Sequence, residues 1–492
     1  MKNKKFAVLL LVSFLTACTC ARKGEETGMI RSPSDELHFK PSKIETEEVT
    51  YEREDDLQWP FDPKSVIQPE RLAKTVMEFL PIPSRSCEEI LYTLYAKRLL
   101  EEVAEPLDIQ VAVDELPRRI ETLDEERRQE YYCNNGLTPP NSGNLIAYIP
   151  GDKELPSWNL SVHLDTNQSS FDGMKREGDL IRPAPGTALG ADDKAGMAII
   201  IEILRVIAEQ KIPHGDIRIV GLVAEEQTAS GVQLIDADAF RGDILISIDG
   251  TDPLEIGRAG PTMYEGVMIV RTSTSHPMDF DEKKSVSACA VGSRLLHETG
   301  FRPEGHPPNH PMVILHSAFV SCGEERGELT PKGEPTASYK YNTVSPYWTA
   351  NWQMRSLEGH EAAARMVSEM RTTMERICLE LSQNRTPVRC EIRGAEKPDL
   401  YGYLVEENHP SVILMNYGIR SLGISARVTA KQFGGFNGNY VFSRFGEEML
   451  SVGTGADQIH TNEETVSVEG MAKVARSILA AMIESYHYRK DD

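Results

Sequence analysis

The sequence SWNLSVHLD, residues 157–165, is an apolar run that ends at His163 and reads as a buried strand. A helical pattern follows at 195–210, AGMAIIIEILRVIAEQ. Two more buried-strand patterns come next, DIRIVGLVA at 216–224 and DILISIDG at 243–250. Alternation of strands and helices is typical of a parallel sheet with helices on both faces. We therefore expect an α/β fold whose central sheet is mainly parallel and flanked by helices.

The helical pattern at 195–210 places apolar side chains on one face. These residues are Met197, Ile200, Ile201, Leu204 and either Ile207 or Ala208. A second pattern of this kind, EGMAKVARSILAAMIES at 469–485, predicts that a helix closes the chain.

Acidic and imidazole side chains follow the predicted strands. His163 and Asp165 end the first strand, Glu225 and Glu226 follow the second, and Asp249 follows the third. Sites in open α/β sheets form at the carboxyl ends of the strands. We therefore expect these five side chains to lie close together.

Two further segments also contain candidate site residues, which makes five such segments in all. They are HLD (163–165), GADDKAG (190–196), AEE (224–226), SIDG (247–250) and QIHT (458–461). Zinc accepts the imidazole nitrogens and carboxylate oxygens that they offer. The number of ligands suits two ions that share one carboxylate. The aspartates of GADDKAG, Asp192 or Asp193, could instead cap the following helix, or both cap and ligate, because Asp is favoured at helix starts.

In this order, the five segments resemble the zinc peptidase family that contains peptidase T, carboxypeptidase G, aminoacylase and succinyl-diaminopimelate desuccinylase. The motif LGADDKAGMA, the following IPHGDIRIV and the glutamate pair are most similar to the peptidase T branch. The segment GTGADQIHTNEETVSVEGM also resembles that branch. The resemblance covers residues 66–487, thinly in the middle. It implies a catalytic domain that carries an inserted, smaller α+β lid or dimerisation domain.

The resemblance also implies a role for each site residue. His163 and Asp249 would bind one zinc, Glu226 and His460 the other, and Asp192 would bridge both. The peptide bond after this bridging residue, Asp192–Asp193, would be cis. Co²⁺ or Mn²⁺ could substitute for zinc.

Two more residues would act on the chemistry. Asp165 would accept the second ring N–H of His163 and so fix its tautomer. Glu225 would serve as general base towards the metal-bound water and then donate a proton to the leaving amine.

Three residues are candidates for substrate binding. His276 in STSHPM resembles a histidine that stabilises the oxyanion, although a surface histidine is the alternative. Arg355 in NWQMRS resembles an arginine that holds a substrate carboxylate, and an ordinary exposed arginine is the alternative. Asn437 lies in GGFNGN at 434–439, where relatives have an acidic residue.

The resulting functional hypothesis is a zinc-dependent exopeptidase for short peptides, specifically a tripeptide aminopeptidase. The changed GGFNGN loop keeps open a deacylase or carboxypeptidase with the same dinuclear chemistry. A binding lipoprotein that has the fold without the activity is the third reading. Net charge is −22, and nucleic-acid binding needs a basic surface, so nucleic acid is excluded as a partner. The protein would be a monomer or a homodimer.

The N-terminus has the pattern of an export signal. Three lysines precede the apolar stretch 6–15, which is too short to span a bilayer. LTAC follows and resembles a bacterial lipobox, in which Cys18 is acylated; an ordinary secretory signal is the alternative. We expect a lipid-anchored protein of the bacterial cell envelope, periplasmic or surface-facing.

We expect five regions along the chain. They are a lipoprotein signal at 1–18, a flexible tether at 19–60, a first catalytic part at 61–260, the inserted domain at 261–375 and a second catalytic part at 376–492.

The eight cysteines show no CxxC pair or regular framework. Export permits disulfides, but the spacing gives no connectivity, and we expect most of the cysteines to be buried thiols. Residues 117–139 look like a charged insertion that carries Cys133. This insertion could shape the substrate site, and surface decoration is the simpler expectation.

Overall fold

The computed structural model describes residues 63–167, 173–273, 285–303, 305–329, 335–338, 344–383, 387–430, 434 and 437–487. The predicted signal, the whole of the predicted tether, Cys18 and His276 lie outside these residues. Within the described part of the chain, no helix has the length and apolar character needed to cross a membrane.

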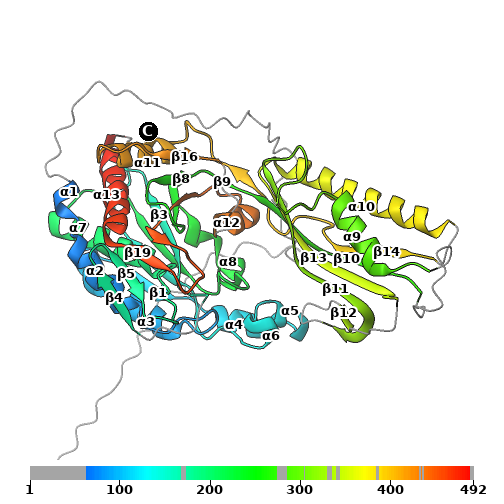
Figure 1. Ribbon diagram of the computed structural model, residues 1–492. Coiled ribbons are helices and arrows are strands. Elements are labelled where there is room, and N and C mark those ends of the chain that lie inside the picture. Colours follow the sequence, from blue (N-terminus) through cyan, green and yellow to red (C-terminus); the bar gives the residue numbers. More distant parts are fainter. Residues whose placement is uncertain are drawn as a thin grey trace, which may run out of the picture.

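The larger part of the molecule is built around an eight-stranded sheet (Figure 1). Its strand order is β1-β2-β6-β3-β7-β17-β8-β16. The strands are β1 (Gln110–Val113), β2 (Leu145–Ile149), β3 (Trp158–His163), β6 (Ile217–Leu222), β7 (Ile244–Ile248), β8 (Glu255–Gly257), β16 (Arg427–Thr429) and β17 (Leu450–Val452). The central strands β6, β3, β7 and β17 run parallel to one another, as expected. Antiparallel pairs join β1 to β2, β2 to β6 and β17 to β8.

Helices cover both faces of this sheet. One face carries α2 (Pro69–Phe79), α3 (Ile90–Ala104), α7 (Lys194–Gln210), α11 (Pro410–Arg420) and α13 (Val468–Glu484). The other face carries α8 (Ser230–Leu234) and α12 (Asn437–Phe445), which close a second apolar cluster over β6 and β7. The short helix α1 (Pro63–Val66) packs against α13. The 3-10 turns are Glu105–Leu107, Ala237–Phe240 and Ser485–His487.

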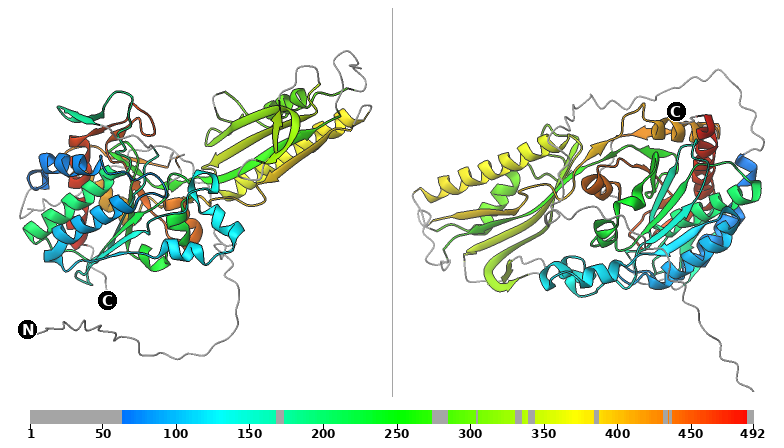
Figure 2. Two further views of the ribbon diagram at one scale, coloured as in Figure 1. Left: turned by 90° about the horizontal axis from the view of Figure 1, so that it is seen from below. Right: turned by 180° about the vertical axis from the view of Figure 1, so that it is seen from behind.

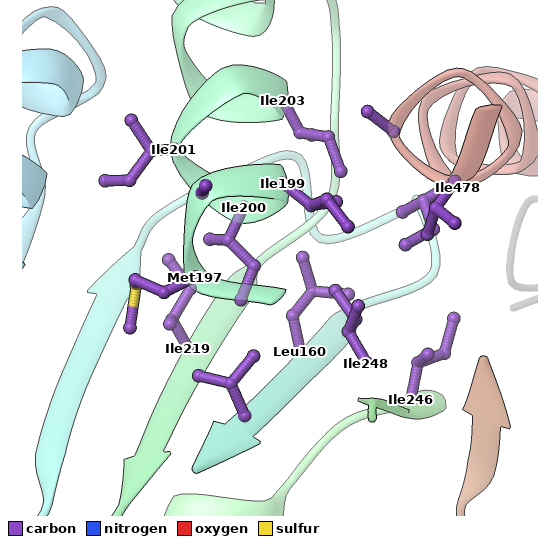
Figure 3. Packing of buried hydrophobic residues seen from close by; sticks show 14 of the residues in the cluster. Leu160, Met197, Ile199, Ile200, Ile201, Ile203, Ile219, Ile246, Ile248 and Ile478 are labelled. Atoms are coloured by element: carbon purple, nitrogen blue, oxygen red, sulfur yellow. The ribbon is translucent and has the colours of Figure 1, made fainter. Parts of the chain in front are cut away.

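Helix α7 forms the centre of the core. Figure 3 shows Met197, Ile199, Ile200 and Ile203 of this helix above strand residues such as Leu160. The sequence pattern assigned α7 a single apolar face, whereas almost the whole helix is buried. The reason is that α2, α3 and α13 pack against the sides that the sheet leaves free. Core burial of this extent anchors the N-terminal end of α7, where GADDKAG lies.

Two smaller sheets complete the larger part. A four-stranded sheet has the order β18-β19-β5-β4, and a two-stranded sheet joins β15 to β9. Their strands are β4 (Met174–Glu177), β5 (Leu180–Pro183), β18 (Ala456–Asp457), β19 (Thr465–Ser467), β9 (Ala259–Gly260) and β15 (Tyr403–Leu404).

A second, five-stranded antiparallel sheet projects from this body, as Figure 2 shows in both views. Its order is β12-β11-β13-β10-β14. The strands are β10 (Thr262–Arg271), β11 (Val313–Leu329), β12 (Pro335–Ser338), β13 (Tyr347–Ser356) and β14 (Arg389–Gly394). Helices α9 (Ala288–Glu298) and α10 (His360–Ser382) share one apolar cluster with this sheet.

The small sheet runs past residue 375, where we expected the inserted domain to end. Residue 375 lies inside α10, and β14 beyond it pairs with β10 along Gly266–Arg271. The predicted boundary overlooked a strand that closes the sheet after its covering helix. The division into functional domains itself stays a prediction.

The expectation that most cysteines are free thiols is wrong. Three disulfides join Cys87 to Cys133, Cys289 to Cys322 and Cys378 to Cys390. The partners lie 46, 33 and 12 residues apart, so local sequence offers no pairing signal. Cys87–Cys133 ties the charged insertion to the larger body. This insertion folds as α4 (Leu116–Glu121), α5 (Glu125–Glu130) and α6 (Cys133–Gly136).

Candidate dinuclear metal site

Three neighbouring parallel strands bring most of the site together. His163 is the last residue of β3, Glu225 and Glu226 follow β6, and Asp249 follows β7 directly. Because β3 lies between β6 and β7 and all three run in the same direction, these residues meet at one edge of the sheet. The sequence predicted this arrangement, and the structure confirms it.

The Asp192–Asp193 segment enters the site at the start of α7. Its peptide bond is cis, as the resemblance implies. The two aspartates have different positions. Asp193 caps α7, because its carboxylate accepts a hydrogen bond from the Gly196 amide at 3.0 Å. Asp192 faces the site. A Cβ at Gly196 would lie only 2.4 Å from the Asp193 carboxylate and 2.6 Å from the Ile248 carbonyl, so the motif needs glycine there.

Asp192 lies between the two histidines. Its Oδ1 is 3.2 Å from His163 Nε2, and its Oδ2 is 3.3 Å from His460 Nε2. The same His460 nitrogen lies 2.8 Å from Glu226 Oε1. Potential ligand atoms of His163, Asp192 and Glu226 all fall within 4.8 Å of one another. One carboxylate that presents each oxygen to a different imidazole has the geometry of a bridging ligand.

The electrostatics indicate a place for cations. Burial raises the pKa of Glu225 well above its usual value, and the charges of Asp249, Asp165 and Glu226 raise it further. Removal from water and the charge of Asp192 raise the pKa of Asp249 to about 7. Such carboxylates repel one another when ionised, unless positive charge is placed among them. Divalent ions supply that charge, and nitrogen and oxygen donors of this kind suit zinc.

The pKa values of the two histidines are raised as well, which for an imidazole favours the charged form. Burial alone would lower the pKa of His163, but its hydrogen bonds to Asp165 and Asp192 hold that pKa well above the usual value. Hydrogen bonds to Asp192 and Glu226 raise the pKa of His460 to about 10. Both imidazoles therefore lie in a region of negative electrostatic potential. A metal cation bound by these histidines would be stabilised by the same potential.

Asp165 organises the site more than the sequence suggested. His163 Nδ1 lies 3.0 Å from the backbone oxygen of Asp165 and 3.4 Å from its carboxylate. The carboxylate itself accepts the backbone N–H groups of Glu225 and Glu226, both at 3.0 Å, and the hydroxyl of Ser86 at 2.7 Å. One fully buried side chain thus fixes both the histidine and the loop that carries the two glutamates.

Sequence reasoning missed Glu464, which supports Asp192 from outside the ligand set, and the buried Lys194 at the start of α7. The Glu464 carboxylate accepts the Gly190 amide at 2.8 Å and the Asp192 amide at 3.0 Å. Lys194, which is fully buried, donates to the Ile82 carbonyl at 2.6 Å. The only sequence signal for Glu464 is its position four residues after His460, on the same loop.

The structure describes two of the three substrate-binding candidates, Arg355 and Asn437. Arg355 on β13 is half-buried, and its charge and that of Glu225 both act on the Tyr440 hydroxyl of α12. The small sheet and the loop that carries Glu225 therefore approach the same tyrosine. Asn437 is fully buried, and its amide oxygen and nitrogen make no hydrogen bond within the described part of the chain. His276 lies outside the described residues.

The comparison with protein families is decisive here. The model of peptidase family M20/M25/M40 matches residues 160–484, a span that contains all five ligand candidates and begins three residues before His163. The chain belongs to this family. It is therefore a metallopeptidase, and the M20 assignment agrees with the branch that the motifs indicated.

Individual relatives of this M20 peptidase extend the picture. It is 25% identical over 355 residues to peptidase T of Exiguobacterium sp., covering 69% of this chain and 76% of that protein. The crystal structure of aminopeptidase PepT from Bacillus cereus shares the fold, with a TM-score of 0.70 at 22% identity over 86% of this chain and all of that one. Bacillus subtilis YXEP, described as a dinuclear metal-binding M20 peptidase, has a TM-score of 0.55 at 13% identity over 85% of this chain and 98% of its own.

Proposed function

We propose that this M20 peptidase is a zinc-dependent aminopeptidase that removes the N-terminal residue from tripeptides. The observation that carries the proposal is the position of Asp192. One of its carboxylate oxygens lies near His163 and the other near His460. The likeness to peptidase T and PepT supports the choice of short peptides among possible substrates.

The donor set fits two ions. His163 and Asp249 would hold one, and Glu226 and His460 would hold the other. Asp192 would be shared by both, because it is the only one of these side chains that contacts both histidines. When bound, zinc would polarise the scissile carbonyl and make water acidic enough to lose a proton near neutral pH.

Glu225 is the proposed proton carrier. Its amide is held by Asp165, which directs the neighbouring Glu226 towards His460 and leaves the Glu225 carboxylate outside the ligand contacts. Its raised pKa, which burial causes, makes it a better base than an exposed glutamate. It would take a proton from the attacking water and then donate that proton to the leaving amine. One side chain would thus carry out both proton transfers.

The substrate would lie between the two parts of the molecule. Arg355 comes from the small sheet and is suited to a substrate carboxylate by its planar guanidinium. The Asn437 amide, buried and without a described partner, is suited to a hydrogen bond with the peptide. His276 stays a candidate for the oxyanion, because it lies outside the described residues.

A second candidate function rests on Asn437. A neutral amide stands where related sequences place an acidic residue, and it cannot form an ion pair with a free α-amine. This substitution favours substrates whose amine is blocked. A deacylase or carboxypeptidase with the same metal chemistry is therefore the alternative.

Substrate selection separates these candidates. A soluble form that lacks residues 1–20, supplied with zinc or cobalt, is expected to release the N-terminal residue from free tripeptides. Mass spectrometry would follow the products, with N-acetylated tripeptides and N-acyl amino acids as matched substrates. A chelator should abolish hydrolysis and added zinc restore it. Faster turnover of the blocked substrates would instead identify a deacylase or carboxypeptidase.

We further propose that the protein is exported and anchored by a lipid on Cys18. The three disulfides support export, because disulfides persist in oxidising compartments. Bacteria that express the full chain and grow with labelled palmitate should incorporate the label into this protein. Cys18→Ser should abolish labelling, whereas Cys20→Ser should not. Labelling that is unchanged in Cys18→Ser would contradict the anchor.

A further inference from the structure

The Cys87–Cys133 disulfide packs against the start of the loop that carries Glu225 and Glu226. Both cysteines are buried, and together with Ala224 they form a small apolar cluster of their own. Ala224 immediately precedes the two glutamates and has a positive φ of 55°. The loop backbone therefore bends sharply where it rests on the disulfide.

The same loop is held at both of its ends by residues next to the disulfide. At its start, Glu89 Oε1 accepts the Ala224 amide and the Cys87 amide, both at 2.9 Å. At its end, Gln227 Oε1 accepts the backbone amide of Asn134, the residue after Cys133, at 2.8 Å. Glu225 and Glu226 thus lie between two fixed points, one on each side of the disulfide.

The covalent link adds an anchor to the insertion that supplies Asn134, whose Ile120 and Tyr131 are also buried in the main core. Helices α4, α5 and α6 contain only six, six and four residues, and helices this short are not stable by themselves. Noncovalent bonds near the link join the same two segments: the Asn141 amide donates to the Cys87 carbonyl at 3.0 Å, and Arg85 donates to the Asn134 side chain at 3.1 Å.

We propose that the Cys87–Cys133 disulfide, with Glu89 and Gln227, positions the catalytic loop, so that full activity requires this one disulfide of the three. The proposal rests on the role given to Glu225 above. The insertion at 117–139 is then a structural support of the active site in addition to a surface feature. None of these four residues contacts the substrate; they act through the position of Glu225.

The chain contains its own matched controls. Cys289–Cys322 and Cys378–Cys390 belong to the small-sheet part, away from the Glu225 loop. The test compares Cys87→Ala/Cys133→Ala with Cys378→Ala/Cys390→Ala in the full chain, at saturating zinc and with tripeptide as the probe. Misplacement of a catalytic group by about 1 Å can cost about a hundredfold in rate. We therefore expect kcat to fall by about ten- to a hundredfold in the first variant, with KM nearly unchanged, and to stay within about twofold in the control.

Gln227→Ala tests the noncovalent half of the arrangement and keeps the disulfide. It should lower kcat by itself, and it should add little to the loss in Cys87→Ala/Cys133→Ala, because both changes release the same contact. A general loss of stability would not produce this non-additivity. Glu89→Gln, which still offers an acceptor to Ala224, should retain more activity than Glu89→Ala.

Hydrogen exchange makes the test independent of catalysis. The amides of Ala224, Glu225 and Glu226 are all hydrogen-bonded, so a peptide covering 223–229 should exchange slowly in the wild type. It should exchange faster in Cys87→Ala/Cys133→Ala and in Gln227→Ala, but not in the small-sheet control. Unchanged exchange and unchanged kcat would overturn the proposal. Faster exchange in a protein that hydrolyses no peptide would support the positioning role and refute the proposed function.

Discussion

Glu225→Gln is expected to lower kcat by about 10²–10⁴-fold, the usual contribution of a general acid–base group. Glutamine has nearly the same shape but cannot accept a proton from water. Because Glu225 lies outside the contacts among His163, Asp192, Glu226 and His460, the metal content should not change. Steady-state kinetics on a tripeptide, with elemental analysis of the same sample, would measure both quantities.

The control for this change is Glu463→Gln. Glu463 is exposed and lies only three residues after His460, yet it takes no part in the ligand contacts. It should keep the kcat of the wild type. If Glu225→Gln retained more than about a tenth of the activity while Glu463→Gln behaved normally, Glu225 would not be the proton carrier.

The second large effect is expected for Asp192→Asn. Loss of an outer partner of a metal ligand typically costs 10–100-fold in affinity, and the loss of a shared ligand should cost more than about a hundredfold. An amide oxygen is a weaker, neutral donor, and the amide N–H₂ would face one of the imidazoles. Both ions should therefore bind weakly, and hydrolysis should fall to background even at moderate zinc concentrations.

Calorimetric titration with zinc would show this directly, because the wild type should bind two ions per chain. Asp457→Asn, an exposed aspartate three residues before His460, should bind zinc as the wild type does. Retention of two tightly bound ions by Asp192→Asn would show that another carboxylate bridges the pair.

The sequence could place the candidate ligands at the sheet edge because the alternation of strands and helices is visible in local sequence patterns. Once SWNLSVHLD, DIRIVGLVA and DILISIDG were identified as parallel strands, His163, Glu225 and Asp249 had to share one edge. A helix cap at Asp192 or Asp193 was also expected from local preference, and Asp193 forms it. These predictions needed no knowledge of distant contacts.

The missed features all depend on distant contacts. Glu464 binds the Asp192 amide across 272 residues of sequence, and Glu89 binds Ala224 across 135. A glutamate that accepts backbone amides has no pattern that distinguishes it from a solvated one. The extra burial of α7 has the same origin, because three helices remote in sequence cover its sides.

The loop that carries His460 and Glu464 has a consequence for how the enzyme matures. Strands β3, β6 and β7 and helix α7 are complete by residue 248, yet the proposed ligand His460 and Glu464, which holds the Asp192 amide, come more than 200 residues later. Domains begin to fold from the N-terminal end during synthesis. A nascent chain can therefore form β3, β6, β7 and α7 before the proposed ion-binding centre is complete, so metal would bind only after the C-terminal segment has been synthesised.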